Sequence, residues 1–158
     1  MMSRLHTYDI VTTWTGNRGV GTASYRAYER EHQLWAAGKP AIEGSADPAF
    51  RGDPTRWNPE EMFVASVSSC HMLWYLHLCA EAGIVVTGYT DDARGEMQED
   101  AAGSGRFTRI ELRPRVALAA ATESERALAL HAVAHAKCFI ARSVRCDIEV
   151  RPKVAGQP

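Results

Sequence analysis

The stretch Asn58–Cys70, NPEEMFVASVSSC, decides how the rest of the chain is interpreted. Asparagine is a favoured N-cap residue, proline suits the first helical position, and two glutamates lie favourably in the first turn. The sequence therefore predicts a helix over residues 58–82 that ends at Gly83. Glu61 is expected to reach back to the amide of Asn58 in a capping box.

The predicted helix places a cysteine on a mostly apolar face. One continuous stripe at helical spacing is formed by Glu60, Phe63, Val67, Cys70, Trp74 and His77. Burial on such a face disfavours the thiolate, so a reactive Cys70 needs a cation supplied by tertiary structure. Glu60 could hold that cation, and arginine suits the role because it stays charged when buried and forks onto a carboxylate.

The composition is that of an ordinary soluble globular protein. The 158 residues fit a single domain, residues 1–158, with 46% hydrophobic and 23% charged residues and a formal net charge of -1. This balance predicts no nucleic-acid partner and no anionic membrane surface. Polar residues interrupt the most apolar stretch, 62–86, which favours a buried helix over a membrane span. No signal peptide is recognised at the start, and we expect a cytoplasmic protein.

The remaining elements alternate in blocks. Two strands are expected within residues 6–30 around a Gly-rich turn at 16–21, with a third strand near 31–35 or 41–43, so that strands occupy the 6–35 region. The other expected elements are a long loop over 36–57, strands over 84–118 with an edge or bulge at Pro114, a second helix over 123–144, a strand over 146–151, and a tail at 155–158. Strands in blocks indicate an α+β fold with mainly antiparallel pairing.

Four cysteines are present: Cys70, Cys79, Cys138 and Cys146. They form no CxxC pair and do not resemble a secreted disulfide framework. The second predicted helix carries its own stripe, formed by His131, His135, Cys138 and Arg142. If the two stripes face each other, a thiol from each helix could meet.

Three interpretations of these stripes remain open at this point. Both cysteines could be packed core residues with satisfied histidines beside them. A metal site could combine His131, His135 and Cys138 with Cys70 or His71. The third interpretation is a redox pair, with an attacking and a resolving thiol. Cys79 and Cys146 are expected to be packed residues without a role in any of the three.

Two motifs resemble one known family. NPEEMFVASVSSC is similar to the signature of the OsmC/Ohr family (osmotically inducible protein C and organic hydroperoxide resistance proteins), in which a Cys follows the Glu of Asn-Pro-Glu by ten residues. AHAKCFIARSV resembles the second family motif, Ala-His-x-x-Cys. The spacing between the motifs and the order of the elements also fit, so the resemblance covers nearly the whole chain.

The resemblance implies an OsmC-like fold, with antiparallel sheets wrapped around two long central helices. It further implies an intertwined homodimer with two active sites at the subunit interface. By motif position, Cys70 would be the peroxidatic cysteine, Cys138 the resolving cysteine, and Glu60 the partner of a catalytic arginine. No cofactor and no metal are implied.

The position of the family's catalytic arginine corresponds to this sequence in one of two ways. In the organic hydroperoxide branch it lies in the Gly-rich turn, where TGNRGVG places Arg18. In the other branch it lies in the loop before the helix, where Arg51 and Arg56 are available. Arg18 is the closer match and is our prediction.

The implied activity is reduction of organic hydroperoxides through a Cys70 sulfenic acid and a Cys70–Cys138 disulfide. An external dithiol, either a lipoyl protein or a small thiol, would then reduce the disulfide. CFIARS replaces the Cys-Pro-Tyr-Ser of many members, which puts the substrate preference and the reductant in question. The alternative is a metal-binding, redox-sensing or small-ligand module on the same fold, with little or no turnover.

Overall fold

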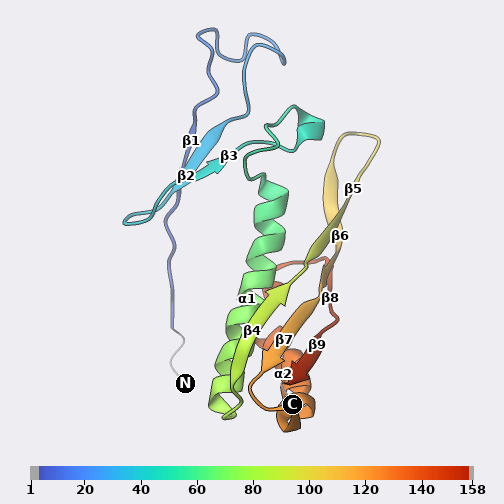
Figure 1. Cartoon of the computed structure of the whole chain (residues 1–158). Helices are drawn as coiled ribbons and strands as arrows, with labels where there is room; N and C mark the ends of the chain where they lie inside the picture. The colour runs from blue at the N-terminus through green and yellow to red at the C-terminus, as the bar shows by residue number, and fades with distance from the viewer. Residues whose placement is uncertain (1–3, 157–158) are drawn as a thin grey trace. The chain divides into compact units, whose positions relative to one another are not determined.

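The computed structural model describes residues 4–156 of the chain (Figure 1). These residues divide into two compact units, one up to Met62 and one from Phe63 onward. The units are described separately below. The helix α1, Pro59–Glu81, begins in the first unit and continues through the second.

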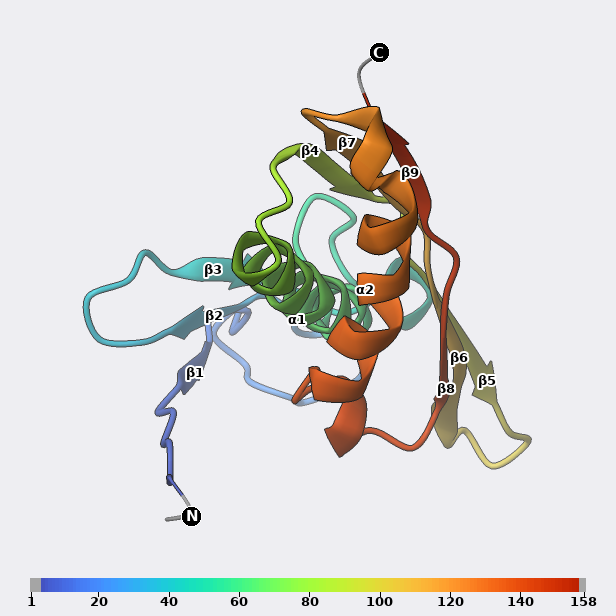
Figure 2. The ribbon, with the colours of Figure 1, turned by 90° about the horizontal axis from the view of Figure 1, so that it is seen from below.

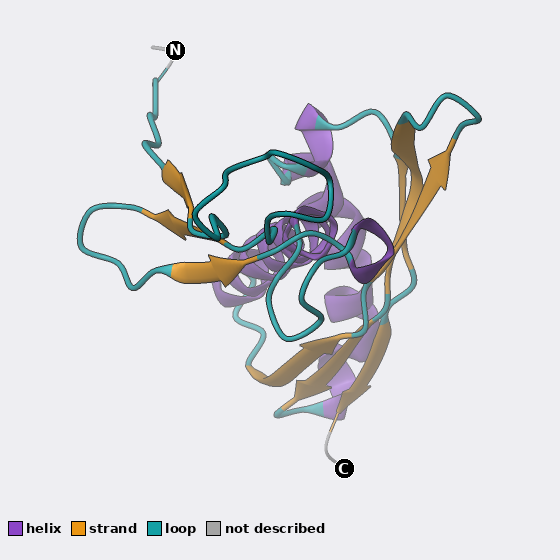
Figure 3. Cartoon of the chain, turned by 90° about the horizontal axis from the view of Figure 1, so that it is seen from above, coloured by secondary structure: helices purple, strands orange, loops and turns teal. Residues whose placement is uncertain are grey.

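The first unit is a three-stranded antiparallel sheet with long loops, drawn in teal in Figure 3. Its strands, in the order β1-β2-β3, are Val11–Trp14, His32–Trp35 and Ile42–Gly44. Both positions proposed for a third strand are therefore strands, whereas the prediction of a second strand after the Gly-rich turn, within residues 22–30, is wrong because these residues form turns and bends. The expected loop 36–57 contains β3 and the 3-10 helix η1, Pro48–Phe50, whose first turn is capped by the side chain of Asp47.

The connection between β1 and β2 is long, but hydrogen bonds join its first residues to its last ones. The Thr15 N–H donates to the Glu31 carbonyl and the Glu29 N–H donates to the Gly16 carbonyl, both at 2.9 Å. A Cβ atom on Gly16 would lie 2.0 Å from the Glu29 carbonyl oxygen. Glycine is therefore required here by the close approach of another backbone segment.

The second unit contains two three-stranded sheets and α2. One sheet has the order β4-β7-β9, formed by Val86–Asp91, Pro114–Leu118 and Lys153–Gly156. The other has the order β5-β6-β8, formed by Arg94–Glu99, Gly105–Leu112 and Asp147–Val150. α2, Ser124–Lys137, contacts β9 and lies beside it in Figure 2.

Four of the six strand pairs in the described residues are antiparallel, so the predicted mainly antiparallel pairing is confirmed, and two pairs are parallel. β4–β7 and β5–β6 are antiparallel, whereas β6–β8 and β7–β9 are parallel. Both parallel pairs involve the last two strands of the chain, because β8 joins β6 and β9 joins β7. β9 also includes two residues expected in the tail; Gln157 and Pro158 lie outside the described residues. Pro114 is not on an edge strand, since β7 is central, and its place as first residue of the strand makes it tolerable.

The second unit has two core clusters, one in which the β4-β7-β9 sheet packs with α1 and α2, and one in which the β5-β6-β8 sheet packs with α1. From α1 the buried residues are Val67, His71, Tyr75, Leu78 and Cys79. This face is rotated from the predicted stripe, because Trp74 is only half-buried and His77 is exposed. By length and composition alone α1 could also span a membrane, a test that the core helix of a soluble protein passes equally.

The second helix is shorter than predicted. It ends at Lys137, and Cys138 is its C-cap with extended backbone (φ −64°, ψ 113°). The Cys138 Sγ accepts the Ala141 N–H at 3.4 Å, and the 3-10 turn η3, Ala141–Ser143, follows. No glycine or proline marks this end, so the sequence pattern predicted a helix that extends beyond the observed end at Lys137. Arg142 is consequently not on the helical stripe.

The start of α1 is the capping box that the sequence predicts. The Glu61 N–H donates to Asn58 Oδ1 at 2.7 Å, and the Asn58 N–H donates to Glu61 Oε2 at 3.2 Å. Two otherwise unpaired N–H groups at the helix start are thereby satisfied. Asn58 is itself buried, so water could not easily replace a hydrogen-bond partner that a substitution removes from the capping box.

Replacing the cap should destabilise the protein measurably. We expect Asn58→Ala to lower the free energy of unfolding by about 1 kcal/mol, because one N–H loses its acceptor. Asn58→Ser keeps an acceptor and should stay close to the parent protein. Urea unfolding of the two variants measures the difference; equal stabilities would show that the box contributes nothing.

Candidate active site

Two thiols that are far apart in the sequence meet in the second unit. Cys70, on α1, is half-buried, and Cys138, at the end of α2, is completely buried. The two side chains are neighbours, because the Cys70 thiol contributes to the raised pKa of Cys138, and both are free thiols. Of the predicted site residues, these two are brought together by the fold.

The two thiols differ in their surroundings. Burial raises the pKa of Cys138 to about 11, with a further contribution from the neighbouring Cys70 thiol. The Ala141 and Ile140 N–H groups act in the opposite direction but do not outweigh burial. Cys138 therefore keeps its proton at neutral pH and is a poor first nucleophile.

Two buried histidines come from the same helices as the thiols: His71 directly follows Cys70, and His131 precedes Cys138 by seven residues. His71 Nε2 and His131 Nδ1 are 3.0 Å apart, and the His131 ring stacks on Tyr75 with 3.8 Å between centroids. Burial lowers the pKa of His71 to about 4 and that of His131 to about 3. Both rings are therefore neutral at pH 7.

The metal-site interpretation receives no support from this arrangement. His71 and His131 bond to each other, and residues 4–156 contain no group of three or more His, Cys, Asp or Glu side chains placed to hold a metal ion. The other nitrogens of this pair and His135 Nδ1 are buried without a partner. Single orphan nitrogens do not make a tetrahedral ligand set.

Glu60 lines a cavity of about 230 Å³ in the first unit. The cavity is lined by Trp14, Tyr28, Arg30, His32, Ser45, Ala46, Asp47, Phe50, Pro59 and Glu60. Glu60 Oε2 is buried and has no hydrogen-bond partner. An unpaired buried carboxylate oxygen is costly, and a cation or donor would satisfy it.

The three arginines considered from the sequence have other surroundings. Arg18 forms an ion pair with Glu29, and its side chain is 64% exposed. Arg56 pairs with Glu43 and lies 3.6 Å from a carboxylate oxygen of Asp53.

Arg51 has a left-handed backbone (φ 66°), and its guanidinium lies 6.0 Å from the centre of the Tyr25 ring. None of the three arginines lines the cavity of Glu60.

Sequence reasoning missed Arg30. Its guanidinium lies over the rings of Tyr25 and Tyr28, at 4.3 and 4.2 Å from their centres. It also donates to the carbonyls of these two residues, at 2.8 and 2.6 Å. The sequence contained a signal, because SYRAYER alternates tyrosine with basic residues, but the pattern is too common to single out one arginine.

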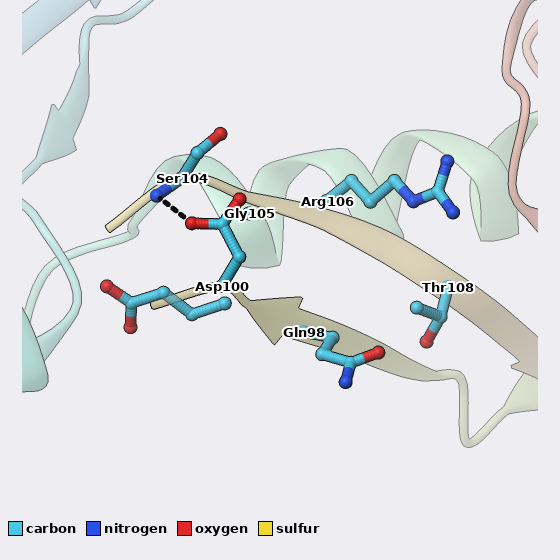
Figure 4. Close-up of a pocket in the computed structure, with 7 residues that line it drawn as sticks. Gln98, Asp100, Ser104, Gly105, Arg106 and Thr108 are labelled. Carbon is cyan, nitrogen blue, oxygen red and sulfur yellow. Dashed lines mark hydrogen bonds between the residues drawn. The ribbon is translucent and has the colours of Figure 1, made fainter. Parts of the chain in front are cut away.

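Two further cavities lie in the second unit. One of about 240 Å³ is at the β5–β6 turn, where Asp100 Oδ1 accepts the Ser104 N–H at 3.0 Å (Figure 4). The other, about 590 Å³, is lined by Phe63, Arg106, Phe107, Thr108, Val144, Arg145, Cys146 and Asp147. Cys146 is half-buried there, and Cys79 is buried in the core, as the sequence predicts for packed cysteines.

The fold and the site together define the class of protein. It is a mixed α+β chain with one thiol on a long helix and a second thiol at the end of another helix. Residues 52–153 match the family model of the OsmC-like proteins. The chain belongs to the OsmC-like family. No curated protein sequence matches it closely enough to count as a relative.

Solved structures extend the comparison. An OsmC-like protein of unknown function from Vibrio cholerae is 30% identical, with a TM-score of 0.83 over 95% of this chain and 99% of that one. An organic hydroperoxide resistance protein from Elizabethkingia anophelis is 20% identical, with a TM-score of 0.69 over 99% and 100% of the two chains. The corresponding protein from Legionella pneumophila is 16% identical, with a TM-score of 0.68 over 97% and 99%. The last two show the shared fold.

Proposed function

We propose that the protein is a thiol-dependent peroxidase that reduces organic hydroperoxides to alcohols. The observation that carries the proposal is the contact between the free thiols of Cys70 and Cys138. Membership of the OsmC-like family supports it, as do structural neighbours named for organic hydroperoxide resistance. Oxidative stress defence is the physiological role we propose.

The order of the chemical steps follows from the two environments. The Cys70 thiolate attacks a peroxide oxygen, the O–O bond breaks, and the alkoxide takes up a proton and leaves as an alcohol. Cys70 is then a sulfenic acid. The Cys138 sulfur attacks it, loses its proton, and releases water as the disulfide forms. Because burial keeps Cys138 protonated, it does not compete for the peroxide.

An external dithiol closes the cycle by thiol–disulfide exchange, and a lipoyl protein or small thiol is the reductant we propose. The thiolate also needs a cation, for which the sequence-based candidate is Arg18 held by Glu60. We further propose that the functional form is an intertwined cytoplasmic homodimer.

Counting thiols during a peroxide titration tests the proposal. One equivalent of cumene hydroperoxide should remove two thiols per chain from the reduced protein, and peptide mapping by mass spectrometry should find a Cys70–Cys138 disulfide. Cys146→Ser is the matched control, because that thiol should not affect the count. A disulfide that excludes Cys138 would contradict the mechanism. A correct disulfide without repeated turnover on any dithiol would instead identify a redox-sensing module.

A further inference from the structure

A hydrogen bond between two buried histidines joins the helices that carry the thiols. His71 on α1 is 1% exposed and His131 on α2 is 2% exposed, and His71 Nε2 lies 3.0 Å from His131 Nδ1. The ring planes differ by only 11° while the ring centres are 5.3 Å apart. The rings therefore meet edge to edge, as a well-aligned N–H···N bond requires. Within residues 4–156 no other side-chain hydrogen bond connects α1 with α2.

The ring of His131 is also held by an aromatic contact. It stacks on Tyr75, with 3.8 Å between the ring centres and 14° between the planes. Tyr75 follows His71 by one helical turn, so His131 contacts two neighbouring side chains on one face of α1. The Tyr75 ring in turn packs against Tyr89 of β4, with 5.9 Å between the centres. α2 is thus fixed to α1 by one directional bond and one stacking contact.

A buried polar pair favours one arrangement of two helices more strongly than an apolar pair does. Burial lowers the pKa of His71 to about 4 and that of His131 to about 3, so the bond joins two neutral rings at pH 7. If α2 slid along α1, both nitrogens would lose their partner where water does not reach them, which is costly. Contacts between apolar side chains are not directional and resist such a movement less.

The histidine bond lies close to the thiol pair along both helices. His71 directly follows Cys70, and His131 precedes Cys138 by seven residues, about two helical turns. Cys138 comes directly after Lys137, the last residue of α2, so its place depends on where α2 lies along α1. A disulfide tolerates only a narrow range of Cβ separations. A shift of α2 would therefore carry Cys138 out of reach.

We propose that the hydrogen bond between His71 and His131 positions the thiol pair, because it fixes α2 on α1 where Cys138 reaches the Cys70 sulfenic acid. This inference rests on the proposed peroxidase function. The two histidines are positioning residues for the second chemical step, in which the sulfenic acid and the Cys138 thiol condense to a disulfide and one water molecule. The first step, attack of Cys70 on the peroxide, does not depend on them.

The test measures how the Cys70 sulfenic acid is divided between two products. Reduced protein receives one equivalent of cumene hydroperoxide in the presence of dimedone, and mass spectrometry quantifies the Cys70 dimedone adduct and the Cys70–Cys138 disulfide. His131→Phe keeps a ring against Tyr75 but removes the bond. We expect it to raise the ratio of adduct to disulfide about tenfold, because a small misplacement of a reacting group slows its step strongly. Peroxide consumption in the first turnover should keep the parental rate.

Three further variants separate positioning from packing. His131→Asn places an amide near the position of Nδ1, so it can restore the bond and should return the ratio toward the parental value. Tyr89→Phe is the matched control, because it removes a buried hydroxyl that has no hydrogen-bond partner from the next ring, and the ratio should not change. The double variant His71→Phe/His131→Phe leaves no nitrogen unpaired, so it should recover stability in urea without recovering the parental ratio.

The possible failures of this test are distinguishable. A parental ratio in His131→Phe would overturn the inference. An equal rise in Tyr89→Phe would also overturn it, since the effect would then belong to the packing of the rings and not to the bond. Absence of a Cys70–Cys138 disulfide in the parent protein would instead overturn the proposed function.

Discussion

Replacing Cys70 by serine should reduce the rate of organic hydroperoxide reduction by at least about a hundredfold, because a hydroxyl at this position is not an effective nucleophile toward a peroxide. The measurement is consumption of cumene hydroperoxide with an excess of dithiol. Cys70 is half-buried and lies next to the Cys138 thiol, so the substitution changes one atom without opening a cavity. The expected loss is therefore chemical and not a consequence of unfolding.

The Cys138→Ser variant distinguishes the two thiols. It should consume one equivalent of peroxide and then stall, leaving a sulfenic acid on Cys70 that a sulfenic-acid reagent such as dimedone detects. Cys146→Ser, on a different cavity wall, should retain the parental rate. Parental turnover in Cys70→Ser would show that this thiol is not the nucleophile.

The buried histidine pair should make the protein acid-sensitive. In the folded state the pKa values of His71 and His131 are about 4 and about 3, against 6.5 for an unperturbed histidine. Between pH 6.5 and pH 4 the unfolded chain therefore binds more protons than the folded one. The free energy of unfolding should fall as the pH falls, by up to about 1.4 kcal/mol per pH unit for each ring, and should be unaffected by these rings above pH 6.5.

Urea unfolding at pH 7, 6 and 5 measures this slope. His131→Phe keeps an aromatic ring against Tyr75 and removes one titrating group, so the slope should fall by about half. His77→Gln is the control, because His77 is on the exposed face of α1. Carboxylates with lowered pKa, such as Glu43 and Glu149, contribute mainly below pH 4.5 and leave this range undisturbed. An unchanged slope in His131→Phe would contradict the assignment.

Local signals predicted the first helix and its cap well. Asn58 and Glu61 bond as expected, because capping depends on neighbouring residues only. The α+β class was also accessible, since blocks of strands are visible in the pattern. The parallel pairing of β8 with β6 and of β9 with β7 was not, because pairing partners are set by contacts between segments distant in sequence.

The candidate site was only partly accessible for the same reason. Motif spacing identified Cys70 and Cys138, whose thiols meet. It could not identify Arg30 as a residue that lines the Glu60 cavity, because that cavity is built by β1, β2, the loops that follow β1 and β3, and the start of α1. The pairing of Arg18 with Glu29 likewise lies outside what a motif encodes.

The early end of α2 has a mechanical consequence. A disulfide requires a specific dihedral angle and a narrow range of Cβ separations, which a residue inside a rigid helix adopts with difficulty. Cys138 lies one residue beyond the helix, on an extended backbone followed by a short turn. If the proposed Cys70–Cys138 disulfide forms, rotation about φ and ψ of Cys138 can bring its sulfur to Cys70 without breaking the hydrogen bonds inside either helix.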